Sequence, residues 1–243
     1  MIALLKKEIA NFFSSIIGYI VIIVFLLITG LFLWVFPVEF NILSFGFAQM
    51  DGLFVIAPFV FLFLIPAITM RSFADEKRTG TIEMLLTKPL SDIKIVMAKF
   101  WAAYILLLIS LLPTLTYYFS VYQLGYPVGN IDTGGIIGSY IGLLFLGGAF
   151  IAIGLFTSSI TTNQIISFIL AVFISGFMYT GFDFIYDFSF FKDFDLLIKS
   201  LGINEHYTSI SRGVVDTRDL IYFISVISLF LLLTKLSLQS RKW

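Results

Sequence analysis

The spacing of charged residues constrains this chain more than any other feature. Asp, Glu, Lys and Arg are absent from five long stretches, at residues 9–38, 52–70, 100–131, 133–182 and 220–234. A helix needs about 20 apolar residues to cross a bilayer, because each residue advances it by about 1.5 Å. The longest stretch, of 50 residues, has room for two such helices and a turn. The sequence therefore predicts six membrane spans, at about 15–36, 53–73, 98–121, 135–157, 164–183 and 220–240.

The composition separates this chain from the soluble classes of protein. Apolar residues make up 59% of its 243 residues and charged residues 12%, whereas soluble domains average roughly 45–50% and 25%. The mean hydropathy is +1.03, so there is too little polar surface to cover a soluble globule. The charge-free stretches are apolar on every side and lack the alternation of a membrane barrel. We therefore expect an all-α integral membrane protein.

The chain lacks the residues that most catalytic and cofactor sites need. It has no cysteine and a single histidine, His206, and it contains neither an HExxH sequence nor a GxxxxGK[ST] phosphate-binding loop. These absences argue against a metal site built from cysteine or histidine and against a nucleotide site on this chain. The net charge of zero makes a nucleic-acid partner unexpected. We expect no catalytic, cofactor-binding or metal-binding residues, and a lipid bilayer around the spans.

The basic residues indicate how the spans are oriented. Eleven of the 15 Lys and Arg residues lie before span 1, between spans 2 and 3, or after residue 234, and ten of the 15 acidic residues lie on the other side. Lysine and arginine collect on the cytoplasmic side of membrane proteins. The sequence thus predicts a single domain, 1–243, with both termini and the 74–97 loop in the cytoplasm. Residues 37–52, 122–134 and 184–219 are expected outside, the last as short helices or a re-entrant element that caps the outer end of the bundle.

Residues 1–14 have the pattern of an amphipathic helix. Their larger apolar side chains share one helical face, which holds Ile2, Leu5, Ile9, Phe12 and Phe13. One interpretation is a helix that lies in the inner membrane interface with this face among the acyl chains. The other is an extension of span 1 whose lysines, Lys6 and Lys7, snorkel toward water.

The loop between spans 2 and 3 contains a second short amphipathic pattern. Gly80 permits a sharp break in the backbone, and Pro89 ends the following helix because the residue before a proline avoids the helical region. Between them, Ile82, Leu85 and Leu86 fall on one face. Charged residues surround this apolar face, namely Glu76, Arg78, Glu83 and Lys88. An apolar face on a charged loop predicts a docking surface for a partner; the alternative is a helix that lies on lipid.

The residues of this loop resemble those of a known family. The run DEKRTGTIEMLLTKPLS is similar to the E-x-x-x-G-T-x-E-x-L-L-x-x-P pattern of type-2 ABC exporter permeases. The matching residues are Glu76, Gly80, Thr81, Glu83, Leu85, Leu86 and Pro89. The stretch NEHYTSISRGVVDTRDLIYF also resembles the segment before the last span of these permeases, while Ala98-Lys99 departs from their frequent Gly-Lys. Within the family, the chain is most similar to the gliding-motility (Gld) permeases of Bacteroidota, F component, and next to the nitrous-oxide-reductase maturation permeases.

This resemblance implies a half-transporter of the bacterial inner membrane. Two six-span permease halves, identical or different, would sit on two cytoplasmic ABC ATPase subunits, which bind ATP and Mg²⁺. The loop segment would be the coupling helix, through which ATPase closure moves the spans. The gliding system implies a further membrane component with a large extracytoplasmic domain. Two alternatives remain open: a membrane scaffold that transports nothing, and a secondary transporter, for which the spans lack central charges.

Small residues follow one another at helical spacing in span 4. Gly134, Gly138 and Gly142 lie four residues apart. Small residues let helix backbones approach closely, and such packing favours helix association in lipid. The pattern indicates either a mobile interface between helices or tight packing within one subunit.

Overall fold

The computed structural model describes residues 1–44, 46, 49–86, 91–188, 195–213 and 216–240. Every regular element in these residues is a helix. Six helical segments are long and apolar enough to cross a membrane, at Ile16–Val35, Asp51–Arg78, Asp92–Leu124, Thr133–Ile160, Gln164–Asp187 and Thr217–Gln239. The predicted all-α, six-span fold class is confirmed.

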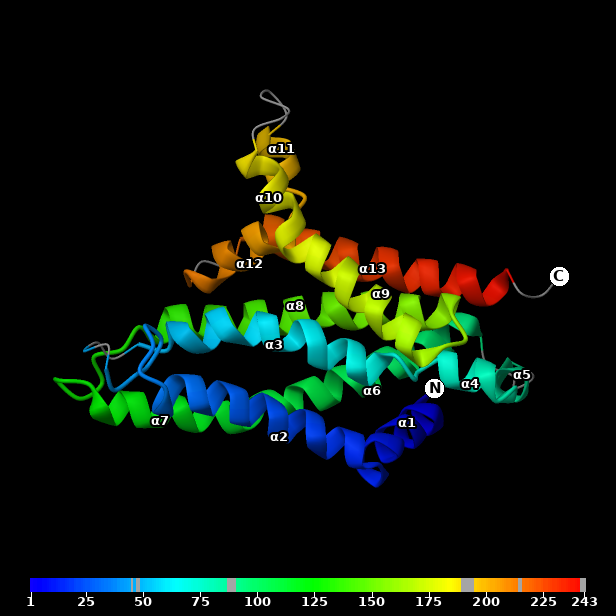
Figure 1. Ribbon diagram of the computed structural model, residues 1–243, viewed down its shortest axis with the longest axis horizontal. Coiled ribbons are helices and arrows are strands. Elements are labelled where there is room, and N and C mark those ends of the chain that lie inside the picture. The colour runs from blue at the N-terminus through cyan, green and yellow to red at the C-terminus, as the bar shows by residue number, and fades with distance from the viewer. Residues whose placement is uncertain (45, 47–48, 87–90, 189–194, 214–215, 241–243) are drawn as a thin grey trace.

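Several of these segments consist of more than one helical element (Figure 1). The longer elements are α1 (Ile2–Ser14), α2 (Ile16–Gly30), α3 (Asp51–Thr69), α6 (Asp92–Leu111), α7 (Leu115–Leu124), α8 (Thr133–Ile160), α9 (Gln164–Gly176), α12 (Ile203–Ser211) and α13 (Thr217–Gln239). The shorter ones are η1 (Leu31–Val35), α4 (Ala74–Arg78), α5 (Thr81–Leu86), η2 (Leu112–Thr114), η3 (Phe177–Gly181), α10 (Phe182–Asp187) and α11 (Asp195–Lys199). The third span begins earlier than predicted, because α6 starts at Asp92 in the expected loop.

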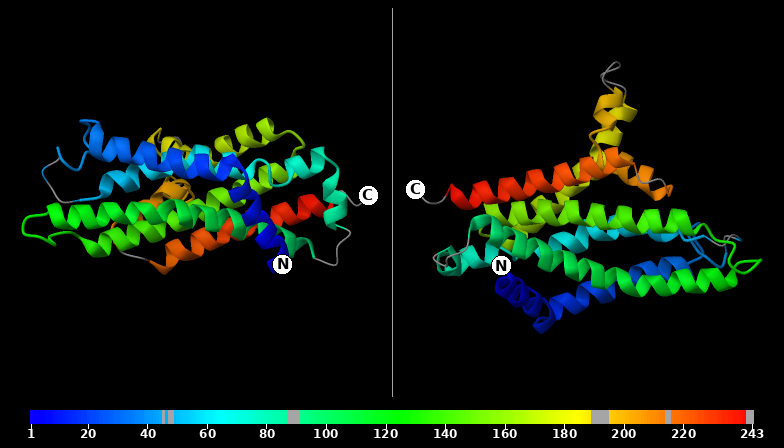
Figure 2. Two further views of the ribbon diagram at one scale, coloured as in Figure 1. Left: turned by 90° about the horizontal axis from the view of Figure 1, so that it is seen from below. Right: turned by 180° about the vertical axis from the view of Figure 1, so that it is seen from behind.

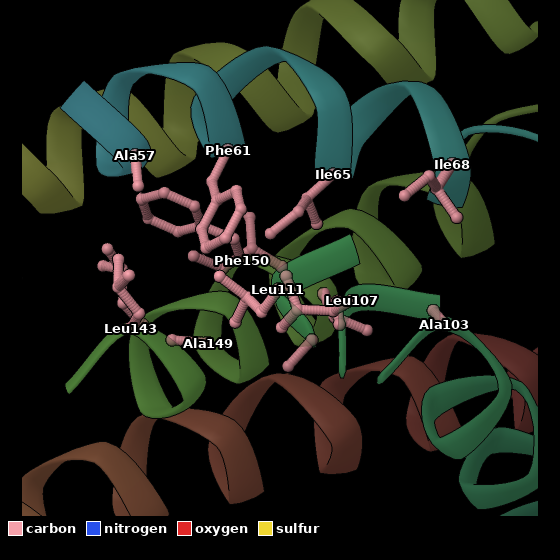
Figure 3. Close-up of a cluster of buried hydrophobic side chains, with 14 of the residues drawn as sticks. Ala57, Phe61, Ile65, Ile68, Ala103, Leu107, Leu111, Leu143, Ala149 and Phe150 are labelled. Carbon is pink, nitrogen blue, oxygen red and sulfur yellow. The ribbon is translucent and has the colours of Figure 1, made fainter. Parts of the chain in front are cut away.

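Helix α8 forms the centre of the bundle and packs against α3, α6, α9, α12 and α13. Figure 3 shows Phe61 and Ile65 of α3 above Phe150 of α8, with Leu107 and Leu111 of α6 close by. Phe150 is fully buried. The outer helices α2, α9 and α13 instead leave many apolar side chains exposed, as expected for surfaces that face lipid or another membrane subunit.

Helix α1 is separate from the first span. Ser15 has extended backbone angles (φ −99°, ψ 151°), which end α1 before α2 begins. The two helices meet at a clear angle in Figures 1 and 2, and α1 packs against α6. This break excludes a straight extension of span 1. The buried side of α1 is centred on Leu4 and Glu8, while Ile2 of the expected apolar face is 70% exposed.

The outer segment leaves the bundle and then returns to it. In Figure 1, α10 and α11 project away from the other helices, and α12 lies back along α8. Two hydrogen bonds fix this return: the Tyr207 hydroxyl donates to the Phe54 carbonyl (2.6 Å), and the Ser139 hydroxyl donates to the Ser211 carbonyl (2.9 Å). The described part of this segment contains short helices, one of the two expected forms, but only α12 packs on the bundle, while α10 and α11 project away from it.

A histidine joins the start of the last span to this outer segment. His206 Nδ1 lies 2.7 Å from Asp219 Oδ1, and Nε2 lies 2.9 Å from the Ser200 carbonyl oxygen. The ring stacks on Tyr222, with the two centroids 3.9 Å apart. Nearby, an ion pair with Glu205 raises the pKa of Lys199. These contacts hold α11, α12 and α13 together.

The glycines of α8 that the sequence singles out face different surroundings. A Cβ atom on Gly138 would lie 2.8 Å from the Ile210 carbonyl oxygen and 2.9 Å from the Gly213 Cα. Gly142 lies against the Tyr207 ring, and Gly134 meets only the Asp132 carboxylate, at 3.5 Å. Two of the three glycines thus allow the segment around α12 to approach α8 within the same chain.

The Gly138→Ala variant should be destabilised, because backbone atoms that cannot move aside occupy the space its Cβ needs. We expect a loss of about 1–3 kcal/mol in the free energy of unfolding, typical of overpacking. Gly134→Ala, at a site with ordinary clearance, is the control and should keep the unmutated stability. Thermal unfolding of the purified protein in mild detergent measures both. Equal melting temperatures for the two variants would contradict this account of the α8–α12 contact.

Candidate functional site

The loop between the second and third spans begins as a continuation of α3. The Ser158 hydroxyl of α8 accepts hydrogen bonds from the backbone N–H groups of Phe73 (3.0 Å) and Ala74 (3.1 Å), and it donates to the Met70 carbonyl (3.0 Å). These groups lie where α3 ends and α4 begins, and Ser158 is fully buried. One side chain from the central helix therefore satisfies three backbone groups at this turn.

Asp75 fixes α4 against the start of the fifth span. Its Oδ1 accepts a hydrogen bond from Gln164 Nε2 (2.7 Å) and pairs with the guanidinium of Arg78 (2.8 Å). Both Asp75 and Arg78 are substantially exposed, so the ion pair contributes little to stability. The amide of Gln164 comes from α9, and its bond to Asp75 connects α4 with that helix.

A turn at Gly80 separates α4 from α5. Gly80 has φ +72°, a left-handed conformation that glycine adopts without steric cost. The Thr79 hydroxyl donates to the Asp75 carbonyl (2.8 Å), and it lies 3.0 Å from the Thr81 hydroxyl. These contacts account for the Gly-Thr pair of the sequence pattern: glycine supplies the turn, and threonine hydroxyls satisfy the groups that the turn exposes.

A buried ion cluster joins this loop to two other elements. Lys99 Nζ lies 2.8 Å from Glu76 Oε1 and 3.2 Å from Glu8 Oε1. Lys99 belongs to α6, Glu76 to α4 and Glu8 to α1. The lysine is 2% exposed, and its ammonium group also lies 5.1 Å from the centre of the Phe73 ring. We refer to Glu8, Glu76 and Lys99 as the inner ion cluster.

The inner ion cluster is sensitive to the loss of any member. Removing a charge from water costs several kcal/mol, which a well-placed opposite charge offsets. Here one cation faces two carboxylates, and Glu76 Oε2 is buried without a hydrogen-bond partner in the described part of the chain. Without Lys99, two carboxylates would lie close together with no cation between them. The three helices therefore depend on one ammonium group for their mutual position.

A small cavity of about 220 Å³ adjoins the inner ion cluster. Its lining includes all three members of the cluster together with Arg71 and Asp75. A polar cavity of this size has room for several water molecules. The space gives the charged groups alternative positions if α1 or α4 moves.

The structure places the residues of the sequence pattern in distinct surroundings. The sequence pattern placed Glu76 among the charged residues around the apolar face of α5. In the structure Glu76 instead pairs with the buried Lys99, whereas Glu83 is exposed. Ile82 is partly buried and packs against the core. Leu85 and Leu86 belong to α5, but their side chains, like the whole of Pro89, lie outside the described residues.

Sequence reasoning did not find the partners of Glu76. Glu8 lies in the expected amphipathic helix but outside its apolar face, and Lys99 follows Ala98 at a departure from the family pattern. The available signal was an acidic residue beside the apolar face of the first helix and a lysine followed by 32 uncharged residues, 100–131. Neither signal predicts that Glu8 and Lys99 form an ion pair, because the two residues are 91 positions apart in the sequence.

The Lys99→Met variant should release α1 and α4 from α6. Breaking a buried ion pair by removing one partner typically costs about 3–5 kcal/mol. Hydrogen–deuterium exchange should therefore accelerate in residues 2–14 and 74–78, while α8 stays protected. Lys94→Met, at an exposed position of the same helix, is the control. The triple change Glu8→Gln, Glu76→Gln and Lys99→Met should restore part of the protection; no recovery would argue against repulsion between the two carboxylates as the cause.

Comparison with known proteins identifies the family of the chain. The family model for ABC-2 family transporter proteins matches residues 2–238, which is nearly the whole sequence. No curated protein matches the chain. Members of this family are transmembrane subunits that associate with an ABC ATPase. The chain therefore belongs to the ABC-2 family of transporter proteins, and it is a multi-pass membrane permease of an ABC exporter.

Proposed function

We propose that this chain couples a cytoplasmic ABC ATPase to movement of the spans through the 74–97 loop, in an export or force-transmitting machine of the gliding-motility type. The inner ion cluster is the observation that carries this proposal. Glu76, the first residue of the E-x-x-x-G-T-x-E pattern, is paired with Lys99 of the third span and, through it, with Glu8. A displacement of α4 therefore acts on α6 and α1 without an intervening flexible segment.

The path of the force has two branches. In the first, α4 continues from α3 across the turn held by Ser158, so a push on the loop is transmitted along the second span. In the second, the inner ion cluster transmits it to the third span and the N-terminal helix. ATP and Mg²⁺ are held by the partner subunit, and the permease contributes the apolar face around Ile82, Leu85 and Leu86 as the docking surface.

The partners of this machine follow from the same arrangement. The exposed apolar faces of the outer spans provide room for a second permease half as well as for lipid. The described outer segment consists of short helices, so a bulky extracytoplasmic function requires another membrane component. A non-transporting scaffold would share the docking surface, but it would have no use for a buried connection from the loop to three helices.

The orientation of the chain is tested by cysteine labelling, because the sequence has no cysteine of its own. In the bacterial inner membrane we expect both termini and residue 83 in the cytoplasm, at the end of the bundle where Figure 1 places α4, α5 and the two termini. A cysteine in place of Glu83 should therefore resist a membrane-impermeant thiol reagent in intact spheroplasts. A cysteine in place of the exposed Val128 should react at once. The reverse pattern would overturn the orientation and the docking proposal.

The docking surface is tested by placing a charge on it. Leu85→Asp should weaken association with the ATPase by at least about tenfold, since burial of a leucine is worth roughly 1.5–3 kcal/mol and 1.4 kcal/mol is one decade in Kd. Co-purification after mild solubilisation measures this, together with membrane insertion, which should be unchanged.

Two variants make the docking test specific. Lys94→Asp introduces an aspartate at an exposed position outside the docking surface and should bind the ATPase normally. Lys99→Met leaves the apolar face intact and should also bind, but with a weaker response of span accessibility to ATP. Equal ATPase recovery from the Leu85→Asp and unmutated proteins would show that the helix lies on lipid and does not couple.

A further inference from the structure

A second and larger cavity lies at the opposite end of the bundle from the inner ion cluster. It has a volume of about 910 Å³ and is enclosed by the first turns of α3 and α8, by η3 and by α12. Binding sites for small molecules typically measure about 300–1,000 Å³. The cavity is therefore large enough for a ligand, and the coupling loop and the inner ion cluster contribute nothing to its walls.

One end of this cavity carries charges of both signs. Asp51, Asp132 and Arg212 line it. The Asp132 carboxylate caps α8 by accepting from the Gly135 N–H (3.0 Å). Asp51 and Arg212 are exposed and make no ion pair with any residue that the structure describes. A free carboxylate and a free guanidinium thus face the same space, which suits a ligand that has both a cation and an anion.

Another wall of the cavity combines aromatic rings with hydroxyl groups, among them that of Tyr179. Tyr179 is 5% exposed and packs edge-on against Phe59, with the centroids 5.9 Å apart. Within the described part of the chain its hydroxyl has no hydrogen-bond partner, although it lines the cavity. The hydroxyl oxygen is accessible from the cavity and is free to donate to a ligand. A neutral acceptor on a ligand, such as an ester carbonyl, would satisfy it.

The apolar part of the cavity is continuous with the outer surface of the bundle. Val55 and Phe59 both line the cavity, yet they are 43% and 51% exposed. Phe59 follows Asp51 by eight residues and so lies about 12 Å further along α3, at 1.5 Å per residue. The cavity therefore runs from charged groups at the helix ends to an apolar opening in the side of a membrane span.

We propose that this cavity is a binding site for a zwitterionic phospholipid, with phosphatidylethanolamine as the matching chemistry. Arg212 binds the phosphate and Asp51 the ammonium group, while the Tyr179 hydroxyl donates to an ester carbonyl of the lipid. The acyl chain lies over Val55 and Phe59 and leaves through the apolar opening. With the proposed orientation of the chain, this lipid belongs to the outer leaflet. The lipid-binding proposal does not depend on ATPase coupling, and its test is independent of the tests of that function.

The test measures which lipid stays bound to the full-length purified chain. The protein in mild detergent is offered equal amounts of phosphatidylethanolamine and phosphatidylglycerol with identical acyl chains, and bound lipid is counted by native mass spectrometry. We expect selective retention of phosphatidylethanolamine. Arg212→Gln and Asp51→Asn should each lower it about tenfold, as expected for loss of a charge-assisted contact. Tyr179→Phe, which removes only the hydroxyl, should lower it roughly fivefold.

Matched controls separate the cavity from general surface charge. Arg218→Gln and Asp187→Asn remove exposed charges of the same kinds that do not line the cavity and should leave retention unchanged. A phosphatidylethanolamine with a photoreactive group in its acyl chain should label the peptide that contains residues 55–59. Hydrogen exchange of α3 and α8 confirms that each variant is folded.

Three results would overturn the proposal. The first is equal retention of the two lipids, or retention that Arg212→Gln and Asp51→Asn leave unchanged. The second is full competition by soluble O-phosphoethanolamine, which would assign the site to a free zwitterion. The third is efficient disulfide formation between two copies of a Val55→Cys variant in the membrane, together with no lipid labelling at 55–59, which would assign the opening to the second permease half.

Discussion

The ammonium group of Lys99 joins the loop between the second and third spans to the N-terminal helix and to α6. It lies within 3.2 Å of two carboxylates that come from the N-terminal helix and from the loop after the second span, and it is 2% exposed. A buried ion pair of this kind does not by itself make a fold more stable than an apolar alternative would. What it provides is specificity: α1, α4 and α6 have one arrangement in which the lysine is neutralised. The proposed coupling, in which these helices move as a unit, would use such a constraint.

Helix α3 connects this constraint to the rest of the molecule. At its inner end it continues toward α4, where Ser158 of α8 satisfies the backbone. At its outer end the Phe54 carbonyl accepts from Tyr207 of α12, so the same helix is bonded to both ends of the bundle. Pro58 and Pro66 lie within it, and each removes a helical hydrogen bond and permits a bend. In the proposed coupling, displacement of the loop would reach the other end of the bundle through this helix, which has two points where it can bend.

The spacing of charges was sufficient to predict the fold class and the number of spans, because the thickness of the bilayer sets the minimum length of each charge-free stretch. The turn at Gly80 could also be predicted from the sequence, because glycine readily adopts the left-handed backbone conformation found there. The inner ion cluster was not predictable in the same way. It joins Glu8 to Lys99 across 91 residues, and no local pattern in the sequence pairs them. The outer cavity was hidden for a similar reason, since its walls come from four elements that meet only after α12 folds back on α8.

Charged side chains are paired in the inner ion cluster, whereas those that line the outer cavity form no ion pair within the described part of the chain. This difference distinguishes groups that hold helices together from groups that are available to the proposed ligand. At the inner end the cation is buried and already neutralised by carboxylates of the same chain, so an external anion would have to displace them. At the outer end Arg212 and Asp51 are exposed and not paired with each other or with other described residues, so they remain available. Helix α3 lines the outer cavity with Phe54 and Phe59 and also continues toward α4. If displacement of α4 moves α3, as the proposed coupling requires, then occupancy of the cavity and the position of the loop bias each other by thermodynamic reciprocity.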